Sequence, residues 1–353
     1  MFVRNNWYVG AWSSEVVWGK LLARRILDTP IVFFRDQNNA AAALHDQCCH
    51  RGLPLSMGRI EAGAVRCGYH GMKYDRSGLC IEIPGQATIP KKACVKSWPL
   101  VEQHGLVWIW CGDTAPECSP PDYPWHGDWL WKGGLFHYEA PQELINDNLL
   151  DLSHLGYVHV QTIGGDPNTH MNAEMRTTRG DGSVTVERFM RSVNPPPTHM
   201  RLNGYENPVD RWQRIRFIPG LITIYSGSVP AGTLRTEGNQ AGGFQQRVFN
   251  AITPETAHTS HYFWSVAHEA VPNSPGMTDS LHADTITTFE EDRVVINAQY
   301  KRMRETPDKR WIDLGIDAGA IQARRIIRER VAAEQAAPMP SAASAASASA
   351  EVS

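Results

Sequence analysis

The sequence predicts an α+β protein of two domains, in which an all-β domain precedes an α+β domain built from an antiparallel sheet and helices. Three observations predict this class. Short apolar runs punctuated by Gly and Pro extend over residues 7–113, alternating runs follow over residues 173–266, and two long helical patterns come last. With 353 residues, 42% of them apolar, the chain can bury a sizeable core.

The first domain is expected to span residues 1–115. Its strands are predicted from apolar runs between turn signals, namely PIVFFRDQ, GAVRCGYHG and GLVWIWCGD. Residues 114–128 contain four prolines and no clear period, which predicts a boundary. The second domain then spans residues 116–336, and the Ala/Ser-rich residues 337–353 are predicted to be a disordered tail.

The second domain is predicted to begin with a helix over residues 142–160, which ends or distorts near Gly156. Its apolar residues recur at helical spacing: Leu144, Ile145, Leu149, Leu152 and Leu155. Alternating runs such as GSVTVERFM, LITIYSG and SHYFWSVAH predict antiparallel strands. Two further helices are predicted over residues 278–304 and 317–335.

Charge and composition exclude several classes of partner. The chain has 34 Lys plus Arg against 37 Asp plus Glu, a net charge of −3, so neither nucleic acid nor an anionic membrane is an expected partner. No run approaches the roughly 18 apolar residues that a membrane span needs. The first residues, MFVRNNWYVGAW, do not read as a secretory signal, so a cytoplasmic location is expected.

Cysteine and histidine pairs give the sharpest chemical signal. All seven cysteines lie in the first third of the chain, and an odd count argues for metal binding or burial over a disulfide framework. Cys48 and His50 form one pair, and Cys67 and His70 form another. Two thiolates and two imidazoles suit a tetrahedral zinc or a 2Fe–2S cluster with two histidine ligands. Because each loop supplies one ligand of each kind, the spacing favours the cluster.

Around these pairs the sequence resembles the Rieske non-haem iron oxygenases. The likeness runs in order through NNWYVGAW, CCHRGLPLSMG, CGYHGMKYD, IPGQ and VWIWCGD. It implies an N-terminal Rieske domain, a C-terminal catalytic domain of the helix-grip type, and Cys48, His50, Cys67 and His70 as the cluster ligands. Relatives usually have proline where this chain has Cys49. The remaining cysteines, Cys80, Cys94, Cys111 and Cys118, match no ligand position.

A second metal site is predicted in the second domain. Asn148, Asp151 and His154 are spaced three apart and would share one face of a helix. His159 would lie about 140° from His154 on an ideal helix, so both reach one metal only if the helix breaks between them. Two imidazoles and one carboxylate form the facial triad of Fe(II) enzymes that bind dioxygen.

The carboxylate is predicted to come from the helix over residues 278–304. There Asp292 shares an otherwise apolar stripe with residues such as Phe289 and Val295, whereas Glu290, Glu291 and Arg293 fall elsewhere. A carboxylate on a buried stripe is costly unless it is paired or metal-bound, which makes Asp292 the first candidate. Asp284, on the same stripe, is the runner-up.

The resemblance adds roles to these residues. The family's pattern of D-x2-H-x4-H with a distant Asp matches Asp151, His154, His159 and Asp292. In such relatives the oxygenase is a trimer, and a carboxylate at the Asp151 position links the cluster of one subunit to the iron of its neighbour. The resemblance therefore implies that Asp151, with Asn148 beside it, is the electron conduit.

The electrons are expected to come from a separate reductase that uses NAD(P)H, because the chain carries no flavin or nicotinamide motif and no second cluster motif. CCHR, IEIPGQ and FEEDR resemble the oxygenases that attack a methyl group, which include vanillate and dicamba O-demethylases and toluenesulfonate methyl-monooxygenase. The favoured function is O-demethylation of a vanillate-like substrate. The alternatives are hydroxylation of the methyl group of a toluenesulfonate- or toluate-like substrate, a Rieske electron carrier, and a zinc-stabilised binding module.

Overall fold

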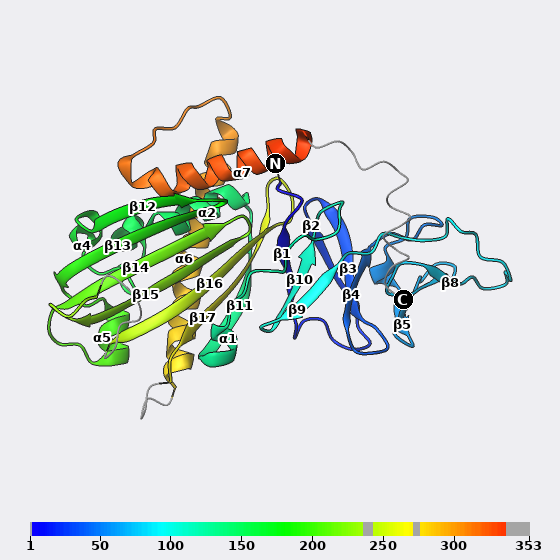
Figure 1. Ribbon diagram of the computed structural model, residues 1–353, viewed down its shortest axis with the longest axis horizontal. Coiled ribbons are helices and arrows are strands. Elements are labelled where there is room, and N and C mark those ends of the chain that lie inside the picture. Colours follow the sequence, from blue (N-terminus) through cyan, green and yellow to red (C-terminus); the bar gives the residue numbers. More distant parts are fainter. Residues whose placement is uncertain (1, 236–242, 271–275, 337–353) are drawn as a thin grey trace.

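The computed structural model describes residues 2–235, 243–270 and 276–336. Figure 1 shows a group of small sheets formed by the N-terminal part of the chain beside one large sheet with its helices. The chain is therefore an all-β part followed by an α+β part, and the predicted fold class is confirmed. The predicted tail at residues 337–353 lies outside the described residues.

Three antiparallel sheets make up the N-terminal part. Their strand orders are β1-β10-β9, β2-β3-β4 and β5-β6-β7-β8. The strand bounds are β1 Trp7–Trp12, β2 Leu22–Ile26, β3 Thr29–Arg35, β4 Ala41–His45, β5 Arg59–Glu61, β6 Ala64–Arg66, β7 Lys73–Tyr74, β8 Cys80–Glu82, β9 Leu100–Gln103 and β10 Leu106–Trp110, with a 3-10 turn at Leu55–Met57. The three predicted strand runs correspond to β3, β6 and β10.

The C-terminal part is built on an antiparallel sheet in the order β11-β17-β16-β15-β14-β13-β12. One row of side chains crosses five of its strands: Val186, Ile215, Ile224, Val248 and Val266 lie opposite one another in register, and all are buried. The bounds are β11 Leu130–Tyr138, β12 Glu174–Gly180, β13 Ser183–Val193, β14 Val209–Ile218, β15 Leu221–Pro230, β16 Phe244–Pro254 and β17 Ser260–His268.

Helices α2, α6 and α7 cover the face of the sheet that carries this row (Figure 1). The α-helices are α1 Trp125–Asp128, α2 Gln142–Leu150, α3 Leu155–Val158, α4 Pro167–Met171, α5 Pro197–Asn203, α6 Met277–Glu305 and α7 Ala318–Ala336, with 3-10 turns at Leu152–His154 and Gly315–Asp317. The predicted helices over residues 278–304 and 317–335 are thus confirmed. Within α6, Phe289, Asp292 and Ile296 are buried, but Val295 is exposed and does not belong to the predicted stripe.

The helix predicted over residues 142–160 is broken earlier than expected. Helix α2 ends at Leu150, and Asp151 has an extended backbone with φ −115°. The Asp151 side chain accepts a hydrogen bond from the backbone N–H of Ser153, which competes with continuation of the helix. Gly156 lies inside α3 and does not break it. A Cβ atom there would lie 2.4 Å from Cα of Pro167, so this glycine permits close packing of α3 and α4.

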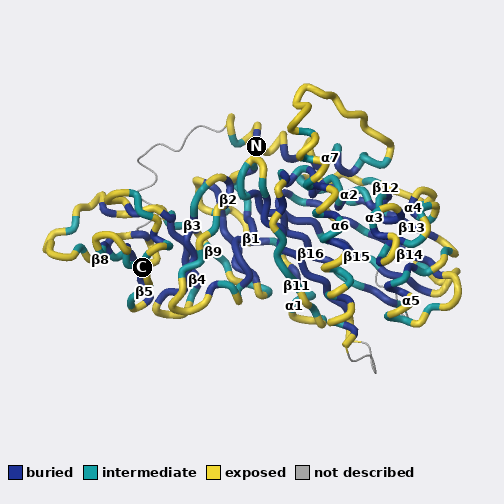
Figure 2. Tube along the Cα trace, turned by 180° about the vertical axis from the view of Figure 1, so that it is seen from behind, coloured by how far each residue is buried: buried dark blue, intermediate teal, exposed yellow. Residues whose placement is uncertain are grey.

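An aromatic core joins the two parts of the protein. Trp7, Trp12 and Trp108 from the small sheets pack in one buried cluster with Phe249 and Phe263 from β16 and β17. The hydroxyl of Thr253 donates a hydrogen bond of 2.8 Å to the carbonyl of Val9 in the same region. Figure 2 shows that β1 and β16 are both buried where they meet.

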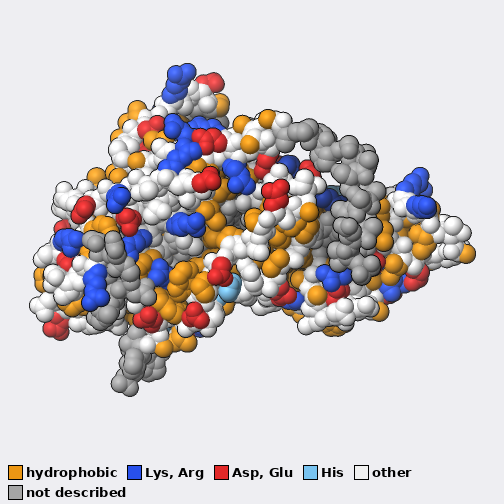
Figure 3. Space-filling model, in the orientation of Figure 1, with side chains coloured by type: hydrophobic (Ala, Val, Ile, Leu, Met, Phe, Trp, Pro, Cys, Tyr) orange, Lys and Arg blue, Asp and Glu red, His pale blue; other side chains and the backbone are white. Residues whose placement is uncertain are grey.

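Charged side chains of both signs are mixed on one face of the molecule. Acidic and basic side chains are interspersed over the face seen in Figure 3, without a large field of one sign. Among the described residues, every helix is too short or too polar to cross a bilayer.

Candidate metal centres

The two cysteine–histidine pairs lie on loops with the same backbone hydrogen bonds. The N–H of Cys48 bonds the carbonyl of Leu53, and the N–H of Cys67 bonds the carbonyl of Met72. The N–H of a glycine then closes each loop on its cysteine carbonyl, and both glycines, Gly52 and Gly71, have positive φ. Two such matched loops present equivalent ligands side by side.

Burial separates the sulfur ligands from the nitrogen ligands. Cys48 and Cys67 are 4% and 2% exposed, whereas the two histidines are exposed. The rings of His50 and His70 have their centroids 4.6 Å apart. Burial raises the pKa of the Cys67 thiol, and the neighbouring Cys48 thiol adds to the rise. The loops thus hold two sulfurs inside and two imidazoles at the surface.

This arrangement fits a two-iron cluster better than zinc. A tetrahedral zinc would draw at least three ligand atoms to within about 4 Å of one another. Among the described residues, the only group of three such ligands within 4.8 Å of one another is a different one, in the second domain. A cluster with sulfur ligands on one iron and nitrogen ligands on the other needs the wider spacing.

Tyr74 contacts both of the adjacent cysteines, Cys48 and Cys49, so only their burial distinguishes them. Its hydroxyl lies 3.1 Å from Sγ of Cys48 and 3.2 Å from Sγ of Cys49. Cys49 is exposed, whereas Cys48 shares the buried cluster with Cys67. This burial supports Cys48 as the ligand, and the assignment stays a prediction.

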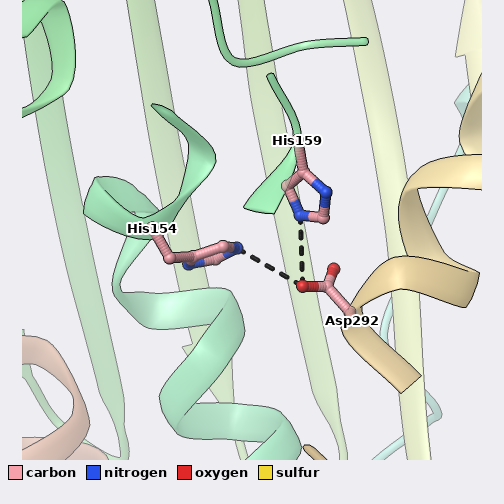
Figure 4. A group of neighbouring side chains, drawn as sticks. All are labelled: His154, His159 and Asp292. Atoms are coloured by element: carbon pink, nitrogen blue, oxygen red, sulfur yellow. Dashed lines mark hydrogen bonds and ion pairs between the residues drawn. The ribbon is translucent and has the colours of Figure 1, made fainter. Parts of the chain in front are cut away.

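The predicted iron ligands converge in the second domain (Figure 4). His154 ends a 3-10 turn, His159 follows α3, and Asp292 comes from α6. Oδ1 of Asp292 lies 3.4 Å from Nε2 of His154 and 3.1 Å from Nε2 of His159. Three ligand atoms that face one point in this way suit a facial triad, so these residues fit a mononuclear iron.

The Nδ1 atom of each of these two histidines has a hydrogen-bond partner. Nδ1 of His154 lies 2.6 Å from the main-chain carbonyl of Asp151, and Nδ1 of His159 lies 2.7 Å from Oε2 of Glu291. Both Nε2 atoms are therefore oriented toward the metal position. Burial alone would raise the pKa of Asp292, but the bonds from His154 and His159 outweigh it and hold the pKa below its usual value.

Glu291 belongs to the site, although its position on the helix predicts that it falls elsewhere, with Glu290 and Arg293. In the structure Glu290 and Arg293 do pair with each other, but Glu291 reaches His159. A second carboxylate beside a predicted ligand was the available signal. Helix periodicity could not find it, because Glu291 reaches the site through a long side chain from the edge of the buried face.

Asn148 and Asp151 do not share one helix face as predicted, because the helix ends between them. Asn148 donates a hydrogen bond of 2.9 Å to Oδ1 of Asp292. The Asp151 carboxylate bonds the N–H and hydroxyl of Ser153, so only its main-chain carbonyl reaches His154.

Asp284, the runner-up for the third ligand, lies apart from the triad. It accepts hydrogen bonds from Thr198 and Arg201 instead.

A cavity opens directly on the triad. Its lining includes His154, His159 and Asp292. Much of its wall is apolar, formed by Leu149, Leu152, Leu155, Ile224, Val248 and Phe289. A small, mainly apolar molecule could thus lie next to a metal held by His154, His159 and Asp292.

Comparison with known proteins supports both centres. Residues 6–99 match the Rieske [2Fe-2S] domain, and residues 138–333 match the vanillate O-demethylase oxygenase C-terminal domain. The iron-sulfur subunit of the toluene-4-sulfonate monooxygenase system of Comamonas testosteroni is 39% identical over 96% of this chain and 100% of its own. The vanillate O-demethylase oxygenase subunit of Pseudomonas sp. (strain HR199 / DSM 7063) is 34% identical over 95% and 96%.

Solved structures agree with this assignment. Dicamba monooxygenase bound to 3,6-dichlorosalicylic acid superposes with a TM-score of 0.88 and 31% identity, covering 95% of this chain and 99% of that one. Another structure of dicamba monooxygenase holds non-haem iron and dicamba. An electron carrier or a zinc-stabilised module would leave the second domain unexplained. The chain therefore belongs to the Rieske non-haem iron oxygenases, and it is a monooxygenase component with a 2Fe–2S cluster and a mononuclear iron.

Proposed function

We propose that this oxygenase component oxidises a methyl or methoxy carbon of a small aromatic acid, and that O-demethylation of a vanillate-like substrate is its reaction. The observation that carries the proposal is the mainly apolar cavity, which opens on His154, His159 and Asp292. The similarity to vanillate O-demethylase over almost the whole chain supports the choice of reaction.

The chemistry balances with dioxygen and two external electrons. One oxygen atom enters a C–H bond of the methoxy group, and the other leaves as water with two electrons and two protons. The resulting hemiacetal collapses to a phenol and formaldehyde. A methyl group on the ring would give a stable benzylic alcohol instead, and the 39% identity to the toluene-4-sulfonate system favours this reaction as the second candidate.

We assign the protein's residues as follows. Cys48, His50, Cys67 and His70 would hold the cluster, and His154, His159 and Asp292 would hold the iron, which supplies dioxygen activation. Asp151 would carry electrons between the centres, and Asn148 would support the Asp292 carboxylate through its hydrogen bond. The proposed domains are residues 1–115 for the cluster and residues 116–336 for the iron.

We propose a separate reductase and a homotrimer. A reductase that takes electrons from NAD(P)H could dock at the exposed edge formed by His50 and His70. Strands β5 and β8, which flank the cluster loops, lie at the end of the N-terminal part that is remote from the large sheet (Figure 1). This placement supports electron transfer to the iron of a neighbouring subunit. A cytoplasmic location stays a prediction.

The test supplies the holoenzyme with a reductase and a panel of methoxylated and methylated aromatic acids. Formaldehyde from a methoxylated acid supports O-demethylation, and benzylic alcohol without formaldehyde supports the second candidate. Absence of both products across the panel would contradict the proposal. Brown colour and acid-labile sulfide in the purified protein check the cluster separately, since a zinc protein is colourless.

A further inference from the structure

A buried arginine forms part of the wall of the cavity. Arg211, on β14, is 3% exposed and lines the same cavity as the iron ligands. Among the residues that the structure describes, its guanidinium donates hydrogen bonds only to main-chain carbonyls, at 3.0 Å to Ile163 and 3.5 Å to Gly164. Burial lowers its pKa to about 10, so it still carries its charge at neutral pH. A buried charge without a counter-charge is costly, which calls for an explanation.

Two other partly buried arginines of this protein have acidic partners, whereas Arg188, which is as buried as Arg211, donates to the carbonyl of His170 but does not line the cavity. Arg35 pairs with Glu102, and Arg24 pairs with Glu15. Within residues 2–235, 243–270 and 276–336, no carboxylate lies within ion-pair distance of Arg211. The absence of a partner therefore sets Arg211 apart from these two.

The two acids that also line the cavity are already engaged. Asp292 accepts hydrogen bonds from His159 and Asn148, and Asp284 accepts bonds from Thr198 and Arg201. Neither carboxylate is left to neutralise Arg211. The cavity therefore contains one positive charge that the described part of the chain does not balance.

A second unsatisfied group lies beside Arg211. Gln213 is two residues further along β14, so its side chain points to the same face of the sheet. It is 5% exposed, it lines the cavity, and its Oε1 has no hydrogen-bond partner among the described residues. A buried polar group without a partner indicates a missing ligand or water.

We infer that Arg211 forms an anion-binding subsite that holds the carboxylate or sulfonate of the aromatic substrate and turns its methyl or methoxy carbon toward the iron ligands. The inference deepens the proposed function and rests on it. A guanidinium offers paired donors that match two oxygens of either anion. The unpaired Oε1 of Gln213 is an acceptor, so it would accept a hydrogen bond from a hydroxyl group of the substrate or from a water. The apolar residues of the cavity wall would contact the aromatic ring of the substrate.

The test compares each acid with its neutral amide of nearly the same shape. The probes are vanillate against vanillamide, and toluene-4-sulfonate against toluene-4-sulfonamide, titrated into holoenzyme by calorimetry. The wild-type protein should bind at least one acid about tenfold or more tightly than its amide, because a charge-assisted bond in a buried site is lost with the anion. The pair that shows the larger ratio identifies the anion.

Arg211→Gln should weaken binding of that acid by about tenfold or more and leave the amide unchanged within about twofold. Arg211→Lys keeps the charge without the planar fork, so it should keep part of the preference. Arg216→Gln is the control, because Arg216 lies on the same strand β14 but is exposed and does not line the cavity. This control should leave the acid-to-amide ratio unchanged.

Equal weakening of acid and amide in Arg211→Gln would overturn the inference and make Arg211 an anchor for the loop at Ile163 and Gly164. Equal affinities in the wild-type protein would also overturn it. If Arg211→Gln loses its cluster spectrum, the wild-type ratio and Arg211→Lys decide the matter. Oxidation of acids and amides at equal rates would contradict only the subsite, whereas oxidation of none would contradict the proposed function itself.

Discussion

Nδ1 of His159 lies 2.7 Å from Oε2 of Glu291, the residue that directly precedes Asp292 in α6. One turn of helix thus supplies both a predicted iron ligand and the carboxylate that orients another. We expect Glu291→Ala to lower iron affinity by about 10–100-fold, because a ligand histidine loses the group that fixes its ring. Iron content after dialysis against a graded chelator measures this.

Glu290→Ala is the matched control, since Glu290 pairs with Arg293 on the solvent side. It should retain iron as the wild-type protein does. Equal iron loss in both variants would mean that the effect comes from the helix as a whole and not from the contact with His159.

Asp292 and Asp284 share α6 and differ in their partners, which gives a direct test of the third ligand. Asp292→Ala should lose the mononuclear iron and keep the visible spectrum of the cluster, because the two centres have separate ligands. Asp284→Asn should keep both. Metal analysis together with the spectrum checks this, and iron retained in Asp292→Ala but lost in Asp284→Asn would transfer the role to Asp284.

Substitutions of the adjacent cysteines Cys48 and Cys49 should have opposite effects on the cluster. Cys48→Ser and His70→Ala should each yield protein without the visible bands of a 2Fe–2S centre, since each would remove a cluster ligand. Cys49→Pro should keep the bands, because Cys49 is exposed. Loss of the bands in Cys49→Pro together with their retention in Cys48→Ser would show that the wrong sulfur was assigned.

Asp151 tests the proposed electron path. Asp151→Asn keeps an acceptor for the N–H of Ser153 but removes the charge, so both metal centres should survive while substrate oxidation falls by about 100-fold or more. Ser153→Ala removes the other contact of this carboxylate and should retain most activity. Rapid mixing of reduced enzyme with substrate and dioxygen would follow cluster oxidation. A normal rate in Asp151→Asn would exclude the conduit role.

His126 gives the protein a stability that depends on pH. Its ring stacks on that of Trp131, with centroids 4.0 Å apart, and burial lowers its pKa to about 4 from the ordinary 6.5. Between pH 4 and pH 6.5, His126 is protonated in the unfolded chain but neutral in the folded chain. Its contribution to the stability of the fold is therefore complete above pH 6.5 and is lost as the pH falls toward 4.

At pH 5 this single group should lower the free energy of unfolding by about 1–2 kcal/mol relative to pH 7. His126→Gln should lose that part of the difference in guanidinium unfolding, and His258→Gln, which alters an exposed histidine, should keep it. An unchanged pH dependence in His126→Gln would show that other histidines account for it.

The sequence predicted elements whose apolar pattern agrees with their packing. Helix α6 matched the prediction because its buried residues recur at helical spacing. The predicted end of the helix over residues 142–160, near Gly156, was wrong. The helix ends before Asp151 because of one side-chain bond to Ser153, and the helical spacing of apolar residues continues on both sides of that break. A local hydrogen bond of this kind leaves no trace in the pattern of apolar residues.

The candidate site also contains residues that the sequence predicts and residues that it does not. His154, His159 and Asp292 could be named from residue type and spacing, and the structure brings them together. Arg211 and Gln213 could not be named, because nothing in an alternating strand tells which of its inward side chains meets a cavity rather than a helix. That information comes only from how β14 and α6 pack.

The stacking of Trp12 on Trp131, with ring centroids 5.6 Å apart, joins one domain to the other. The Trp12 indole N–H also donates a hydrogen bond of 3.1 Å to the carbonyl of Gly134 in β11. Two coupled indoles at this distance should give an exciton signal in the circular dichroism at the strong far-ultraviolet transition of indole. Trp131→Phe removes this pair and leaves the second pair, Trp7 with Trp110, in place, so the difference between the two spectra reports domain docking without any label.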